Sequence, residues 1–146
     1  MRLGDFFNGD LVRKAAERNV EPGNVIVCNI PLIDHPKFLV PLSRRDNLVG
    51  GILINSNINW NVNSTTELAE LQYPVLRRNN MFLDHDSFAD CSQLFPQSYD
   101  ALVDQLVSNS YTHIGKLVED DLSEILRLVT ASPTITKAEL IRYGFV

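Results

Sequence analysis

Residues 37–43 read Lys-Phe-Leu-Val-Pro-Leu-Ser, and residues 48–55 read Leu-Val-Gly-Gly-Ile-Leu-Ile-Asn. Each run is short and mainly apolar, and the polar sequence Arg-Arg-Asp-Asn separates them, so the pattern predicts two consecutive strands joined by a turn. Pro41 has no backbone N–H to donate to a neighbouring strand, which places it at the edge of a sheet or at a β-bulge. The pair Gly50-Gly51 is typical of a bulge or a sharp bend in the next strand. These residues therefore predict a small, strongly curved antiparallel sheet.

The regions on either side predict further strands and helices. Apolar residues recur at helical spacing over residues 5–19, which predicts an amphipathic helix, and the β-branched run at 25–30 predicts a buried strand. A short element is expected at 66–71 and leads into residues 73–76, strand pieces are expected at 81–83 and 87–91, and helices at 96–107, 122–130 and 136–143. Thr136 and Glu139 have the spacing of a capping box at the start of the last helix. Short strands followed by helices indicate the α+β class.

The composition is that of one folded domain. The chain has 146 residues, of which 45% are hydrophobic, enough for a single domain with its own core. It contains no run of about 18 apolar residues, so we expect no contact with a membrane and a cytoplasmic location. The formal net charge of −5 argues against generic nucleic-acid binding. A local basic face for RNA or an acidic peptide remains open, and its candidate members are Lys37, Arg44, Arg45, Arg77 and Arg78.

The two cysteines, Cys28 and Cys91, both occur in apolar, strand-like surroundings. A chain of this length does not need a disulfide to fold, so we expect two buried thiols rather than a bridge. Apolar surroundings also disfavour the thiolate that a nucleophilic cysteine requires.

Five short segments occur in an order that resembles the PemK/MazF toxin family. Residues 23–28 are similar to the family's opening strand and residues 37–43 to its second strand. Residues 52–56 are similar to the third strand, which ends in Thr or Ser, and residues 86–94 to the fourth signature. Residues 114–117 are similar to the segment before the final helix. The resemblance covers residues 23–131 and implies a small SH3-like antiparallel β-barrel with added helices. Residues 1–22 would then be an N-terminal helical extension and residues 132–146 a C-terminal helical tail, all within a single domain.

The resemblance also implies a function. Members of the family are homodimeric endoribonucleases of toxin-antitoxin systems that cleave single-stranded RNA without a metal or another cofactor and are neutralised by an antitoxin protein or peptide. They act mainly through an Arg at the start of the second strand and a Thr or Ser at the end of the third. Here Lys37 occupies the first position and Ser56 the second, and the family's Arg-Pro pair is absent. Arg grips a phosphate with two parallel donors whereas Lys supplies one point charge, so Lys37 would be a weaker phosphate clamp.

The neighbours of these two positions complete a candidate site for RNA. His35 lies two residues before Lys37 and is a candidate base or acid, with a loop histidine capped by Asp34 as the structural alternative. Asn55 and Ser56 are candidate donors to phosphate oxygens, and the alternative is that they serve only as turn residues at the end of a strand.

Four further side chains are candidate substrate-binding groups. Arg44 or Arg45 would add positive charge near the phosphate. Trp60 lies in an asparagine-rich segment and would either stack on an unpaired base or belong to the core. His85 would join the same RNA pocket.

The sequence Asp-His-Asp-Ser at 84–87 also suggests a metal site or the active site of a Ser-His-Asp hydrolase. On a strand, Asp84 and Asp86 would share one face while His85 would point away, and no second histidine-rich cluster completes a metal shell, so we expect no metal. A Ser-His-Asp hydrolase is disfavoured because the chain has no Gly-x-Ser-x-Gly motif.

A function of a different class stays open beside the ribonuclease. The chain would then be a catalytically inactive SH3-like barrel that acts as a protein-interaction or regulatory module. The missing Arg-Pro pair and the acidic net charge favour this alternative, whereas Ser56 and the order of the five segments favour the enzyme.

Overall fold

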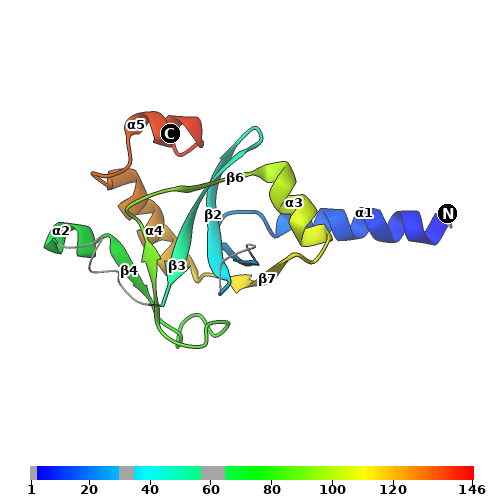
Figure 1. Ribbon diagram of the computed structural model, residues 1–146, viewed down its shortest axis with the longest axis horizontal. Coiled ribbons are helices and arrows are strands. Elements are labelled where there is room, and N and C mark those ends of the chain that lie inside the picture. Colours follow the sequence, from blue (N-terminus) through cyan, green and yellow to red (C-terminus); the bar gives the residue numbers. More distant parts are fainter. Residues whose placement is uncertain (1–2, 30–34, 57–64) are drawn as a thin grey trace.

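The computed structural model describes residues 3–29, 35–56 and 65–146, with side chains described from residue 8 onward. In chain order its elements are α1 (Leu3–Arg18), β1 (Asn24–Cys28), β2 (Lys37–Arg45), β3 (Leu48–Asn55), α2 (Thr66–Ala69), β4 (Gln72–Val75), β5 (Ser87–Asp90), β6 (Phe95–Ser98), α3 (Tyr99–Val107), β7 (Tyr111–Lys116), α4 (Glu119–Ala131) and α5 (Lys137–Arg142) (Figure 1). The α+β class expected from the sequence is confirmed.

The seven strands found in these described ranges form one antiparallel sheet with the order β4-β5-β3-β2-β1-β7. On the side of β3 that faces away from β2, the first half of β3 pairs with β6 and its last two residues pair with β5. The end strands β4 and β7 do not pair with each other, so the sheet is open. An antiparallel sheet is therefore confirmed, whereas a closed barrel is not.

The bend expected at Pro41 is a bulge in the middle of the sheet. Pro41 lies opposite Gly51 and Ser43 lies opposite Gly50, so the register between β2 and β3 shifts by one residue at this point. The alternative of an edge position is wrong, because β2 lies between β1 and β3. A Cβ atom on Gly51 would come within 2.7 Å of the end of the Leu39 side chain and 3.1 Å of the Val40 carbonyl oxygen, so glycine is the residue that fits here without a shift of Leu39.

Both faces of the sheet are buried under helices. On one face, Val40 of β2 belongs to a core that includes Ile125 and Val129 of α4. On the other face, Leu39 belongs to a second core that includes Leu102 of α3. Neighbouring residues of β2 thus point to opposite cores, as the period of a strand requires. In Figure 1, α4 lies behind the sheet while α1 and α3 lie together at one end.

The N-terminal extension is a helix, as expected. The last turns of α1 contact the body through Ala16, which is 5% exposed, and the first half of the helix projects away from the rest of the molecule (Figure 1). In the described parts of the chain, no helix combines the length and apolar character needed to cross a bilayer.

Three local expectations were wrong. Residues 81–83 form a turn and not a strand. The helix expected from residue 96 begins only at Tyr99, because the Ser98 side chain caps it by accepting from the Ala101 N–H, and residues 95–98 form β6. β7 was not predicted, since its six residues are exposed or half-buried and give no apolar run. The capping box of Thr136 and Glu139 at the start of α5 is confirmed.

The prediction of two buried thiols is confirmed. Cys28 and Cys91 are free and are 1% and 0% exposed. They belong to the two different cores on opposite faces of the sheet, so they cannot reach each other to form a disulfide. Burial raises the pKa of each thiol to about 12.

Candidate functional site

A cavity of about 450 Å³ opens at the end of the sheet where β2 begins, β3 ends and β5 begins. Its walls come from three separate parts of the chain. The first is residues 35–38 and the second is residues 53–56. The third consists of residues between 72 and 93, which lie on β4, on β5, in the loop 76–86 that joins them, and just after β5. Strand register explains why the first two walls meet. Phe38 pairs with Ile54, so Lys37 before it and Asn55 after it are neighbours at the same end of the sheet.

Five of the residues predicted from the sequence line this cavity. His35 and Lys37 come from the start of β2, Asn55 and Ser56 from the end of β3, and His85 from the loop 76–86. His35, Ser56 and His85 are exposed, while Lys37 and Asn55 are half-buried. One cavity is thus lined by one lysine, two histidines, an asparagine and a serine of the predicted set, together with the aspartates Asp84 and Asp90.

Arg44 and Arg45 do not line the cavity. They lie at the far end of β2, about 23 and 26 Å along the strand from Lys37 at the usual rise per residue. The Arg44 guanidinium stacks 3.4 Å from the centre of the Tyr99 ring. Arg45 donates to the carbonyl oxygens of Ile141 and Val146, at 2.6 and 3.0 Å. Both cations therefore have local partners in the fold.

Trp60 and Asp34 lie outside the described residues. The stacking of Trp60 on a base and the capping of His35 by Asp34 therefore stay predictions.

The His85 ring is oriented by the backbone of its own loop. Its Nδ1 lies 3.0 Å from the carbonyl oxygen of Asp86 and 3.3 Å from the hydroxyl of Ser87. In the tautomer with a proton on Nδ1, the ring donates to the Asp86 carbonyl, and Nε2, which has no contact among these, is the ring nitrogen available to a ligand. Because residues 84–86 are not in a strand, the expected sharing of one face by Asp84 and Asp86 is wrong. Asp84 lines the cavity, while Asp86 accepts from the backbone N–H of Arg77 at 2.8 Å.

Sequence reasoning missed a buried carboxylate beneath the cavity. Asp90 is 9% exposed and accepts from the side chains of Gln72 at 2.8 Å and Gln93 at 3.2 Å. It also accepts from the backbone N–H and the hydroxyl of Ser92. The spacing of Asp90 and Ser92 is that of an Asx turn and is a local signal, but the contact with Gln72 depends on the pairing of β4 with β5. Four donors hold this carboxylate, so it fixes the floor of the site.

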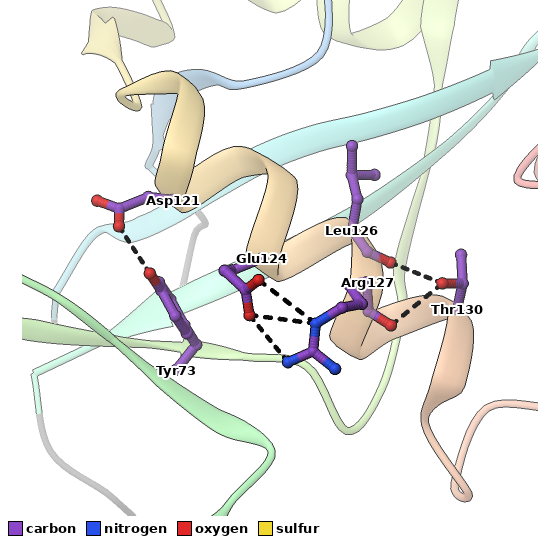
Figure 2. Close-up of polar contacts among 6 residues, drawn as sticks. All are labelled: Tyr73, Asp121, Glu124, Leu126, Arg127 and Thr130. Carbon is purple, nitrogen blue, oxygen red and sulfur yellow. Dashed lines mark hydrogen bonds and ion pairs between the residues drawn. The ribbon is translucent and has the colours of Figure 1, made fainter.

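The wall that carries His85 is anchored to α4 (Figure 2). The Tyr73 hydroxyl of β4 donates to one oxygen of Asp121 at 2.7 Å, as Figure 2 shows. The Asn80 amide of the loop 76–86 donates to the other oxygen at 2.8 Å. Asn80 is 2% exposed and also accepts from the backbone N–H of Val118. Desolvation and the hydrogen bond to Asp121 raise the pKa of Tyr73 to about 12. One carboxylate thus ties a strand and a loop of the site to the same helix.

The side chains of the site can bind and transfer protons to a small anionic ligand. Lys37 supplies positive charge, Ser56 and Asn55 can donate hydrogen bonds, and histidine is the residue type suited to proton exchange near neutral pH. Within the described parts of the chain, no three His, Cys, Asp or Glu side chains form a group that could hold a metal ion.

No protein-family model matches this chain, and no curated protein matches it. Membership of the PemK/MazF family therefore rests on the five sequence segments and stays a proposal.

Proposed function

We propose that the chain is a toxin-like endoribonuclease of the PemK/MazF kind that cleaves single-stranded RNA without a metal, with its strands arranged as an SH3-like barrel. The observation that carries the proposal is the grouping of His35, Lys37, Asn55, Ser56 and His85. The sequence singled these residues out from three distant segments, and all five line one cavity. A cavity of about 450 Å³ lies within the range of small-ligand sites and suits a nucleotide of an unpaired strand.

The chemistry of metal-free RNA cleavage matches the residue types in the cavity. The 2′-hydroxyl attacks the adjacent phosphorus, which requires a base for its proton, a cation for the charge on the phosphate oxygens, and an acid for the leaving 5′-oxygen. Lys37 is the cation, and His35 exchanges a proton with the substrate. Asn55 and Ser56 donate to the non-bridging oxygens. Nothing in this scheme requires the distant Arg44 and Arg45.

The proposal includes the partners that the family resemblance implies, namely a second copy of the chain and an antitoxin. Helix α1 supports a partner contact, because Leu11 and Val12 near its middle are 62% and 49% exposed. Burying these two apolar side chains under another protein would be favourable.

The experiment is a cleavage assay with purified protein, a mixed-sequence single-stranded RNA and DNA of the same sequence, in excess chelator. The proposal expects cleavage of the RNA alone, with products that end in a 2′,3′-cyclic phosphate and a 5′-hydroxyl. Intact RNA after prolonged incubation with folded protein would overturn it.

In that event the alternative is the catalytically inactive interaction module. The observation that favours it is the open sheet, since the end strands β4 and β7 are not paired with each other and an added strand could extend the sheet.

A further inference from the structure

We propose that His35 and His85 act as an acid–base pair in the cavity, so that one imidazole takes the proton of the 2′-hydroxyl and the other delivers a proton to the 5′-oxygen. This inference rests on the proposed function and deepens it. It adds a second proton-transfer residue to the site and gives His85 a role in the reaction rather than in binding.

The distribution of histidines supports the pair. The chain contains three histidines, and two of them line this one cavity from different walls. The third, His113, lies 2.8 Å through Nε2 from the side-chain oxygen of Asn24, whose amide nitrogen donates to the carbonyl of Glu21. His113 therefore has a structural partner at the junction of α1 and β1, whereas both cavity histidines are exposed to an entering ligand.

The loop geometry supports a reactive role for His85. The Asp86 carbonyl holds its Nδ1 and leaves Nε2 available, which is the arrangement that a general acid or base requires. The loop itself is braced: the Arg77 side chain donates to the carbonyl of Leu83 at 2.9 Å, and the Asp86 carboxylate accepts from the Arg77 backbone N–H. The His85 imidazole thus belongs to a loop, residues 76–86, that is held by its own internal hydrogen bonds.

The other titratable groups of the cavity do not replace the two imidazoles. Asp90 already accepts from four donors and lies beneath the surface. Lys37 serves as a cation and has no acceptor atom in its charged form. Asp84 is exposed on the same wall as His85 and is the remaining competitor, which the experiment below separates from the histidines.

The proposed step balances as follows. One neutral imidazole accepts the 2′-hydroxyl proton while the 2′-oxygen forms a bond to phosphorus. The bond between phosphorus and the 5′-oxygen breaks, and the other imidazole, in its protonated form, gives its proton to that oxygen. The products are a 2′,3′-cyclic phosphate and a 5′-hydroxyl, and the two rings have exchanged protonation states. Proton exchange with water restores them.

The test uses two oligonucleotides that carry one ribonucleotide at a site cleaved by the wild type. The scissile bond of the first has its natural 5′-oxygen, and that of the second has a 5′-sulfur, which leaves as a thiolate without needing a proton. The proteins are the wild type, His35→Ala, His85→Ala, Asp84→Asn and the matched control His113→Ala. Thermal unfolding and binding of an all-deoxy oligonucleotide check that each variant folds and binds.

We expect His35→Ala and His85→Ala each to slow cleavage of the oxygen substrate by about 100-fold or more. Sulfur should restore the rate for one of these two variants, which identifies the acid, and leave the other slow, which identifies the base. His113→Ala should cleave like the wild type, and Asp84→Asn should show no rescue by sulfur.

Three results would overturn the inference alone, while the wild type still cleaves the RNA. They are retention of activity in either cavity variant, failure of sulfur to rescue at least one of the two or rescue of both equally, and rescue of Asp84→Asn by sulfur. A folded wild type that cleaves neither substrate nor any RNA would overturn the proposed function and the acid–base pair together.

Discussion

At the scale of single residues, Lys37 is the one lysine or arginine among the described residues of the cavity wall. A lysine offers a point charge, whereas an arginine in its place would offer two parallel donors to a phosphate. We therefore expect Lys37→Arg to raise kcat/KM for RNA cleavage by about 10-fold, which corresponds to about 1.4 kcal/mol of transition-state stabilisation. Steady-state kinetics on one defined RNA measures this, with the exposed Lys137→Arg as the control. A lower rate for Lys37→Arg would contradict the phosphate-clamp role.

The two thiols give a second prediction at this scale. Burial raises the pKa of both Cys28 and Cys91 from 9.0 to about 12, so the folded state holds these protons more tightly than the unfolded state. Their contribution to the free energy of unfolding is complete below pH 9 and is lost as the pH rises through about 12. At pH 8 we expect a disulfide reagent to label neither thiol in the native protein and both in denaturant. Rapid labelling of the native protein would contradict the buried placement.

At the scale of elements, the Asp121 carboxylate of α4 holds β4, through the Tyr73 contact drawn in Figure 2, and also the loop 76–86, through Asn80. Tyr73→Phe removes one hydrogen bond and should lower the free energy of unfolding by about 1 kcal/mol. Asp121→Ala also leaves the buried Asn80 amide without this acceptor, so it should cost about 2–3 kcal/mol. Denaturant unfolding measures both changes.

The same helix offers a control for this prediction. Glu124 pairs with Arg127 at 2.8 Å on the exposed side of α4, also drawn in Figure 2. Exposed ion pairs contribute little, so Glu124→Gln should leave stability unchanged. Limited trypsin digestion should cut faster after Arg77 or Arg78 in Asp121→Ala than in Glu124→Gln. Equal stability and equal digestion of the two variants would contradict the anchoring role of Asp121.

The elements that the sequence predicts well are those with strong local signals. Apolar runs identify β2 and β3, and the capping box of Thr136 and Glu139 marks α5 correctly. β6 and β7 were missed because their residues are at most half-buried, and their strand conformation depends on pairing with β3 and β1. Local propensity carries no information about such distant partners.

The residues of the candidate site also divide into those that the sequence identified and those that it missed. Lys37 and Ser56 were singled out by the resemblance to the PemK/MazF family, and His85 by its residue type, and the structure brings all three to one cavity. Asp90 and its partner Gln72 were missed, because their contact exists only once β4 pairs with β5. Arg44 and Arg45 were included for their charge alone, which says nothing about which end of β2 they occupy.

At the scale of the whole molecule, α1 projects from a body that is otherwise covered by its own helices (Figure 1). If the chain forms a homodimer through this helix, the double variant Leu11→Glu and Val12→Glu should dissociate it, because two charges would enter an apolar contact. Light scattering coupled to size exclusion measures the mass. Ile141→Glu, which alters a 44% exposed side chain on α5, is the control. A double variant with the same dimeric mass as the wild type would rule out α1 as the dimer contact.

The central claim is that the cavity around Lys37 cleaves RNA, and it is tested most directly by comparing the wild type, Lys37→Ala and Lys137→Ala on one mixed-sequence single-stranded RNA in excess chelator. The account predicts cleavage by the wild type and by Lys137→Ala at the same sites. It predicts a rate lower by about 100-fold or more for Lys37→Ala, because the transition-state charge loses its cation. Equal cleavage by all three proteins, or no cleavage by a folded wild type, would contradict it.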